Sequence, residues 1–246
     1  MLIRLPARAA PLAGRAAVGL LVLTALALLL LACNGKGGRD ADGTNTTNGN
    51  KDAEKILRQV VLQQADVPSG LQASDEQLTT NEQLIASSPD PKAARREVDE
   101  WGRILAFEAT FQPEPDAPPD MAVQAISSSA SLYGDAAGAG LSYAKAERSI
   151  DETDWKSQHP ELQDFQQQIV KKGGLADELV WLRLSGVSPT LKGLVVEDLM
   201  IFRSGRVRGF LRVLSATTGE DRKVLLADVE GWLGKQLEHV KGALGS

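Results

Sequence analysis

Cysteine, histidine and aromatic residues are all scarce in this chain, and each scarcity excludes a class of protein. The 246 residues include one cysteine and two histidines, which are too few for a zinc finger, a cysteine-rich metal cluster or a disulfide scaffold. Aromatic residues make up only 4% of the chain, whereas apolar residues make up 43%. We therefore expect no metal site, and a packed core that consists mostly of leucine, valine, isoleucine and alanine.

The sequence also lacks an excess of positive charge and a recognisable catalytic motif. It has 27 basic and 32 acidic residues and a net charge of -5, so we expect no nucleic-acid partner. It contains no G-x-S-x-G, H-E-x-x-H or P-loop motif. The glycine-rich stretch 134–140 lacks the third glycine of a dinucleotide fingerprint and the lysine of a Walker motif, and it predicts close helix packing instead. We predict a protein that is not an enzyme and needs no cofactor.

The N-terminus is the most informative stretch of the sequence. The first 15 residues contain Arg4, Arg8 and Arg15 and no acidic residue, and residues 16–32 are apolar at all but two positions. A basic segment followed by such an apolar segment is typical of a secretory signal peptide. A membrane-spanning anchor is the alternative, but the apolar run is at the short limit for crossing a bilayer.

The end of this apolar run, Leu30-Leu31-Ala32-Cys33, resembles a bacterial lipobox, in which the cysteine is acylated and becomes the N-terminus after cleavage. Cys33 is the only cysteine in the chain. One acyl chain binds a membrane weakly, whereas two or more anchor a protein stably. We therefore predict that residues 1–32 are removed, and that lipid on Cys33 holds the protein on the extracytoplasmic face of the cell membrane or outer membrane.

The rest of the chain divides into a tether and one domain. Residues 34–50 are mostly glycine, asparagine, threonine and aspartate and include no large apolar residue. With Cys33 they are expected to form a flexible tether over 33–50. No internal repeat follows, so we predict a single α+β domain over 51–246.

Apolar residues at helical spacing predict helices over 52–64, over 91–101 with Asp90 as N-cap, from Asp135 as N-cap to about Arg148, and from Gly219 onward. The final helix has the clearest apolar stripe, which consists of Leu225, Val229, Trp232, Leu233, Leu237 and Val240.

Alternation of period two predicts five strands, at 104–111, 123–133, 179–184, 194–202 and 206–214. Residues 71–88 fit no element clearly, and 149–174 are expected to form a loop with a short helix near 160–171. The order of elements predicts an antiparallel sheet of about five strands packed with helices, including a long C-terminal amphipathic helix, which is an α+β fold.

The last two strands allow a prediction of their pairing. A two-residue loop at Ser204-Gly205 would place Glu197 opposite Arg212, an opposite-charge pair that supports such a register. The same register places Asp198 beside Leu211 on the more apolar face. A buried carboxylate needs partners or a raised pKa. Asp198 therefore indicates a paired or functional carboxylate, a bulge, or an end of the sheet that is open to water.

One face of the last strand is the candidate binding surface. Its residues are expected to lie beside Leu199 and Ile201, and they are Arg206, Arg208, Phe210 and Arg212. A basic face with an exposed aromatic side chain suits an anionic lipid headgroup, a polyanion or a protein partner. The alternative is a face that is solvated or covered by a helix.

Three short motifs resemble those of a known group of proteins. They are DVPSG at 66–70, LADE at 175–178 and FRSGR at 202–206. With the lipobox and the final helix, they resemble bacterial envelope lipoproteins and sensor-type extracytoplasmic domains with a PsbP-like α+β fold, although Ala176 stands where that group often has glycine. The resemblance covers most of 52–242 and implies a fold and a location, but no shared catalytic residue.

Three functions are compatible with these predictions. The favoured one is a membrane-anchored, non-catalytic binding or assembly module that docks an envelope protein or a cell-wall component. The alternative is a carrier or sensor of an apolar small molecule or lipid, held between the sheet and a helix. A third is an enzyme whose site is not visible in the sequence. A cavity large enough for a ligand would favour the carrier, and a tightly filled core would contradict it.

Overall fold

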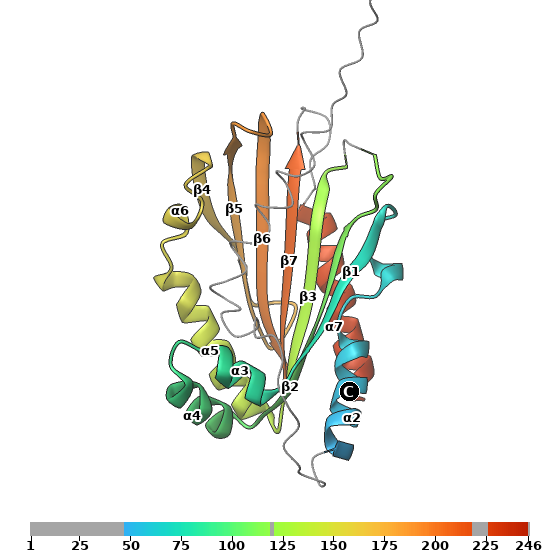
Figure 1. Cartoon of the computed structure of the whole chain (residues 1–246), viewed down its shortest axis with the longest axis vertical. Coiled ribbons are helices and arrows are strands. Elements are labelled where there is room, and N and C mark those ends of the chain that lie inside the picture. The colour runs from blue at the N-terminus through green and yellow to red at the C-terminus, as the bar shows by residue number, and fades with distance from the viewer. Residues whose placement is uncertain (1–46, 119–120, 218–225, 246) are drawn as a thin grey trace, which may run out of the picture.

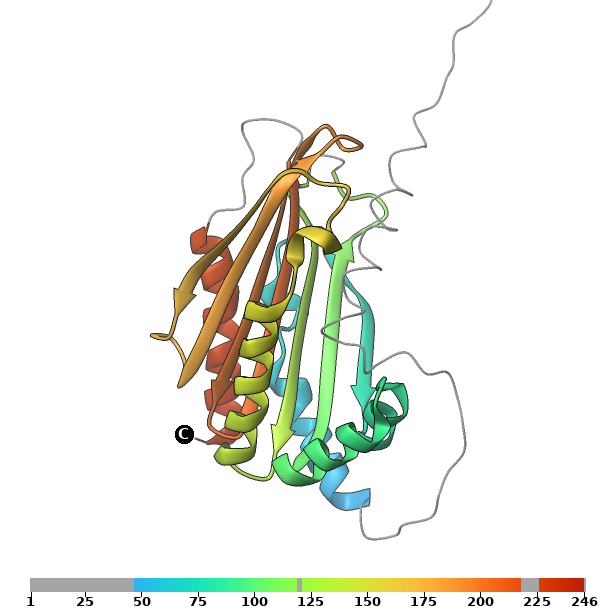
Figure 2. The same cartoon turned by 90° about the vertical axis from the view of Figure 1, so that its left-hand side faces the viewer.

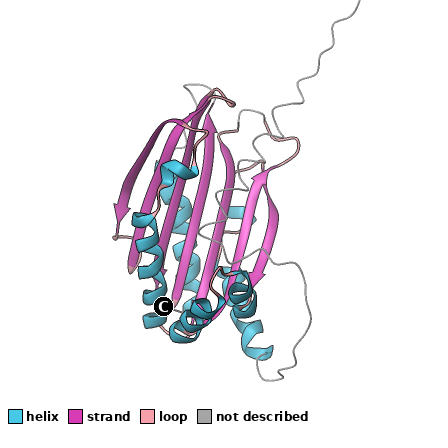
Figure 3. Ribbon diagram, turned by 60° about the vertical axis from the view of Figure 1, so that its left-hand side comes forward, coloured by secondary structure: helices cyan, strands magenta, loops and turns pink. Residues whose placement is uncertain are grey.

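The computed structural model describes residues 47–118, 121–217 and 226–245, which form one antiparallel sheet with helices on both faces (Figure 3). The strands pair in the order β1-β2-β3-β7-β6-β5-β4. In chain order they are β1 (Leu71–Thr79), β2 (Arg103–Pro113), β3 (Val123–Tyr133), β4 (Gln163–Lys172), β5 (Glu178–Ser188), β6 (Gly193–Ser204) and β7 (Val207–Thr217). The predicted α+β fold is confirmed.

The described α-helices lie on the two faces of this sheet (Figures 1 and 2). One face, which we call the α7 face, is covered by α2 (Thr47–Val60) and α7 (Leu226–Leu244). The other, which we call the α5 face, carries α3 (Asn81–Ser87), α4 (Pro91–Trp101), α5 (Ala136–Glu152) and α6 (Trp155–Gln158). A short 3-10 helix, Gln64–Asp66, lies between α2 and β1.

The sheet has seven strands, so the prediction of about five was wrong. The two missed strands, β1 and β4, are the edges of the sheet. β1 is exposed from residue 72 to 76, and β4 is exposed along most of its length. An edge strand pairs along one side only, and where neither of its faces is covered it needs no alternating apolar pattern. β4 also replaces the short helix predicted near 160–171.

The larger core lies between the sheet and the helices α2 and α7. Alternate residues of β2 from Leu105 to Phe111 are buried there, as the period-two pattern predicted. Residues 219–225, where the last helix was predicted to begin, lie outside the described residues. The remaining residues of its predicted stripe are buried, and they are Val229, Trp232, Leu233, Leu237 and Val240.

Side-chain caps fix the beginnings of two helices on the α5 face. Asp90 Oδ1 accepts hydrogen bonds from the backbone N–H groups of Lys92 and Ala93 at 3.1 and 3.0 Å. Asp135 Oδ1 accepts one from Gly138 at 2.8 Å. Both predicted N-caps are therefore confirmed. By contrast, α2 begins at residue 47 instead of 52 and so includes the last residues of the predicted tether.

The glycine-rich stretch 134–140 packs two helices closely, as predicted. A Cβ atom on Gly138 would lie 1.9 Å from the backbone oxygen of Trp101 at the end of α4. No larger residue fits there without a shift of the backbone. Gly138 therefore holds the first turn of α5 against the end of α4, and this contact sets the spacing of the two helices above the sheet.

The pairing of β6 with β7 differs from the prediction by two residues. The two-residue loop is Gly205-Arg206, one residue later than predicted, so Glu197 lies opposite Leu214 instead of Arg212. Gly205 has a positive φ of 55°. Type II′ turns favour glycine with such a φ at the first loop position, which explains why the loop begins at this residue.

Asp198 is fully buried on the α7 face, and it is paired. Its carboxylate accepts hydrogen bonds from Trp181 Nε1 at 2.7 Å and from Arg183 Nε and Nη2 at 2.8 Å each. It lies opposite Val213, so the predicted position beside Leu211 was wrong. Of the alternatives that the sequence left open, a paired carboxylate is the one observed, since β6 and β7 pair without a bulge here.

Candidate ligand-binding groove

A groove with a volume of about 480 Å³ opens on the α5 face. Its floor is formed by β2, β3 and β7, and the helices α3, α4, α5 and α6 contribute its walls. Small-molecule sites in proteins have volumes of about 300–1,000 Å³. The groove is therefore large enough for a ligand of ordinary metabolite or fatty-acid size.

The floor of the groove is polar, although it lies on the central strands of the sheet. Ser129 of β3 lies opposite Glu108 of β2, and Ser131 lies opposite Arg208 of β7. All four side chains line the groove. Side chains directly opposite each other on paired strands lie about 5 Å apart at Cβ. The floor thus presents two hydroxyl groups between a carboxyl group and a guanidinium group.

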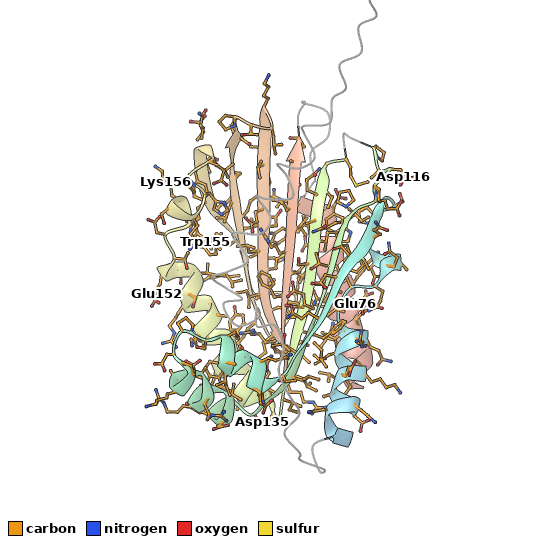
Figure 4. The ribbon with its side chains drawn as sticks, in the orientation of Figure 1. Glu76, Asp116, Asp135, Glu152, Trp155 and Lys156 are labelled. Carbon is orange, nitrogen blue, oxygen red and sulfur yellow. The ribbon has the colours of Figure 1, made fainter. Side chains whose placement is uncertain are left out.

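The groove has one wall that is mostly apolar, on the side of α3 and α4, and a second wall, on the side of α5 and α6, that also carries polar and charged side chains. Leu84 of α3 and Val98 of α4 line one side, and Ala146 of α5 and Trp155 of α6 line the other. Trp155 is buried between α6 and the sheet, and its Nε1 donates to the backbone oxygen of Ile150 at 2.9 Å (Figure 4). Small-molecule sites combine apolar side chains with polar groups that orient the ligand, and this groove offers both.

Three of the charged side chains that line the groove, Arg103, Lys145 and Glu97, have partners within the protein. Arg103 donates to Asn81 Oδ1 at 2.6 Å and to the backbone oxygen of Thr79 at 3.1 Å. Lys145 of α5 and Glu97 of α4 form an ion pair of 2.5 Å across the groove. These contacts hold the walls and the floor together, and they leave Arg208, Glu108 and the exposed Glu152 of α5 as the charged groups to account for.

Arg208 has a hydroxyl partner but no ion pair with any carboxylate of the described residues. Its Nη1 donates to Ser142 Oγ of α5 at 2.9 Å, and the hydroxyl of Tyr133 lies 2.6 Å from the same oxygen. A guanidinium group carries five N–H donors. One donor of Arg208 is therefore held by α5, and the side chain lines the groove.

Glu108 has an unusual protonation equilibrium. Burial and the negative charge of Asp75 raise the pKa of Glu108 to about 7, although the positive charge of Arg212 and a hydrogen bond with Thr110 oppose this rise. Both the neutral and the ionised carboxyl group are therefore accessible near neutral pH. The neutral form can donate a hydrogen bond into the groove, which the ionised form cannot.

The predicted basic strand face is only partly accessible in the structure. Arg212 and Glu197 are both buried and form an ion pair of 2.5 Å, which crosses diagonally between β7 and β6. Phe210 is half-buried against the cluster beneath α5. Arg206 lies in the hairpin loop, and Arg208 lines the groove. The residues that share a face therefore have four different environments.

The two histidines have structural neighbours. His159, which is buried, lies 3.7 Å from Glu197 and stacks on Phe165 with ring centroids 5.7 Å apart. His239 Nδ1 lies 3.1 Å from the backbone oxygen of Val61. Within the described residues, no group of three or more His, Cys, Asp or Glu side chains could hold a metal ion.

Sequence reasoning missed the groove itself. Serines 127, 129 and 131 alternate along one face of β3, and two of them, Ser129 and Ser131, line the groove. Serine is an unusual choice for a central strand whose two faces are both covered, because such strands tend to be apolar on both sides. This excess of hydroxyl groups was the signal for a face that is left partly open.

Comparison with models of known protein families gave no match, and neither did comparison with curated protein sequences. Among solved structures, the chain is similar to the extracellular domain of PknH from Mycobacterium tuberculosis, with a TM-score of 0.48 and 8% sequence identity. The match covers 78% of this chain and 97% of that one.

The predicted lipid anchor lies outside the residues that the structure describes. These residues begin at 47, so Cys33 and the predicted signal peptide, 1–32, are not among them. In the described ranges, no helix is long and apolar enough to cross a membrane. Lipidation at Cys33 and the PsbP-like resemblance therefore stay predictions.

Proposed function

We propose that this protein is an exported, lipid-anchored binding protein that holds a small molecule in the groove of the α5 face. The observation that carries the proposal is the groove itself, with a volume of about 480 Å³, a polar floor and apolar side chains on both walls. Of the two binding functions considered for the sequence, the groove favours the carrier or sensor over the docking module, because a docking surface needs no cavity of this size.

The arrangement of the groove suits recognition better than catalysis. Ser129 and Ser131 lie on a strand of the sheet, and neither has a histidine or other general base among its hydrogen-bonding partners in the described residues. A nucleophilic serine needs such a base within hydrogen-bonding distance. Hydroxyl groups on rigid strands are, by contrast, well placed to orient a bound ligand. We therefore assign the floor a binding role.

The groove can be tested by filling it. Ser129→Trp places an indole ring on the floor of the groove, and we expect it to abolish binding of a small molecule. Native mass spectrometry of the protein purified from its own host should show a bound mass that is lost on denaturation in the wild type and in Gln72→Trp. Gln72 is exposed on the edge strand β1 and does not line the groove, so it provides the matched control.

Two results would contradict this proposal. One is the bare polypeptide mass in both spectra of the wild type together with no binding of added small molecules, which would return the docking module to first place. The other is a bound mass that Ser129→Trp retains while circular dichroism shows the same fold. In that case the ligand would lie elsewhere on the protein.

The anchor has its own test. Cys33→Ser removes the only thiol in the chain, so we expect complete loss of an alkyne-labelled fatty acid that the wild type incorporates. Absence of label on the wild type, or label that persists on the Cys33→Ser variant, would show that Cys33 is not the acylated residue. Partition between membrane and soluble fractions is a weaker measure, because an uncleaved apolar N-terminus also binds membranes.

A further inference from the structure

The charged groups of the groove indicate the chemistry of its ligand. Lys145 is neutralised by Glu97, and Arg103 is held by Asn81 and the backbone of β1. Arg208 remains as a cation that pairs with no described carboxylate, and it lines the groove. A guanidinium group that is half-buried and lacks a counter-charge favours an anion among the groups that could approach it.

The surroundings of Arg208 are those of a carboxylate site. The hydroxyl of Ser131 lies on the neighbouring strand, directly opposite Arg208. Ser142 fixes the guanidinium group from the side of α5 through a hydrogen bond of 2.9 Å. The charge is therefore oriented before a ligand arrives, which reduces the entropy that binding would otherwise cost. A carboxylate accepts two parallel bonds from such a group and a third from a hydroxyl.

Given the binding function proposed above, we infer that the groove takes a carboxylic acid with an apolar tail. Its carboxylate would contact Arg208 and Ser131, and its tail would lie along the apolar wall residues Leu84, Val98, Ala146 and Trp155. A purely apolar ligand would leave Arg208 desolvated without a partner, which costs free energy. A cation would be repelled by the same group.

Glu108 limits the charge that the ligand can carry and makes its binding depend on pH. The charged groups that act on Glu108 are Asp75 on β1 and Arg212 on β7. Arg208, Arg103, Lys145, Glu97 and Glu152 also line the groove. Below pH 7 the neutral Glu108 tolerates an anion nearby and can donate a hydrogen bond. Above pH 7 the ionised Glu108 repels an anion in the groove. It repels a phosphate dianion more strongly than a carboxylate, because the dianion carries twice the charge.

The test compares three ligands of one chain length but different head groups. They are decanoate, decanol and decyltrimethylammonium, titrated by calorimetry at pH 6 into the mature chain that carries Cys33→Ser. We expect decanoate to bind about ten- to a hundredfold more tightly than decanol, which is the range for a hydrogen-bonded charged pair. Decyltrimethylammonium is expected to bind most weakly. This comparison uses no groove variant, so it does not depend on the folding of one.

Two groove variants then assign the effect to residues. Arg208→Met should reduce decanoate affinity to that of decanol and leave decanol binding unchanged. Arg206→Met is the matched control, since Arg206 lies in the hairpin loop and does not line the groove, and it should change neither. Decanoate binding to the wild type should weaken as the pH rises from 6 to 8, and Glu108→Gln should remove this dependence.

The outcomes separate this inference from the proposed function. If none of the three ligands binds, and no native ligand is found, the groove is not a small-molecule site and both proposals fail. If decanol binds as tightly as decanoate, or Arg208→Met keeps the preference for decanoate, the groove binds ligands but the carboxylate inference is overturned. A preference for decyltrimethylammonium would overturn it as well and would assign the head-group site to Glu108.

Discussion

Replacement of Asp198 by alanine is expected to lower the free energy of unfolding by about 3–5 kcal/mol, the cost of removing one partner from a buried ion pair. Asp198 is fully buried and accepts three hydrogen bonds, two from Arg183 and one from Trp181. The substitution leaves a guanidinium group and an indole N–H without partners beneath α7, and it leaves a cavity. Urea unfolding followed by circular dichroism measures the loss.

An exposed ion pair of the same type is the control for Asp198. Glu76 lies 2.7 Å from Arg58, but its side chain is 54% exposed, and it is visible at the edge of the sheet in Figure 4. We expect Glu76→Ala to cost less than about 1 kcal/mol, as is usual for surface pairs. Equal losses for the two variants would show that burial does not determine the contribution of Asp198.

The sequence was sufficient to predict the interior of the sheet but not its edges. β2 and β3 alternate because one of their faces packs against the helices α2 and α7 while the other faces the groove, and this difference appears directly as a period of two. β4 has no such difference between its faces, and its row of glutamines is compatible with a strand, a loop or a helix. Only the pairing with β5 decides its structure.

The β6–β7 hairpin shows a different limit. Opposite charges at Glu197 and Arg212 correctly indicated that these residues interact, but the ion pair forms diagonally and not across the register. Long side chains reach diagonal neighbours on paired strands, so a charge pair is compatible with more than one register. The conformation of Gly205 decides between them, and a residue's φ angle is not visible in the sequence.

The groove could not be predicted because its walls come from segments that the sequence assigned weakly. Leu84 belongs to α3, which lies in the stretch 71–88 that fitted no element, and Trp155 belongs to α6, which was expected to be loop. Arg208 was selected as part of a binding surface, and it lies in the groove. Arg212 and Phe210 were selected by the same pattern. However, Arg212 is buried in its ion pair with Glu197, and Phe210 packs against the cluster beneath α5.

Glu108→Gln is expected to stabilise the protein above neutral pH. Burial raises the pKa of Glu108 from 4.5 to about 7 in the folded state, so the folded protein holds this proton more tightly than the unfolded chain. The free energy of unfolding therefore falls as the pH rises from about 4.5 to 7, and the loss is complete above 7. Glutamine cannot ionise, so at pH 8 the variant should be more stable than the wild type by about 1–3 kcal/mol.

The pH dependence of this gain separates it from other effects of the substitution. At pH 4, Glu108 is mostly neutral in both the folded and unfolded states, and the wild type and Glu108→Gln should unfold at nearly the same urea concentration. Glu100→Gln, at an exposed position on α4 without an ion pair to the described residues, should change stability little at either pH. A gain from Glu108→Gln of the same size at pH 4 and pH 8 would contradict the argument, because it would come from packing and not from ionisation. A gain confined to high pH would mean that the protein retains a destabilising carboxyl group in its groove, which is expected where a residue is selected for binding and not for stability.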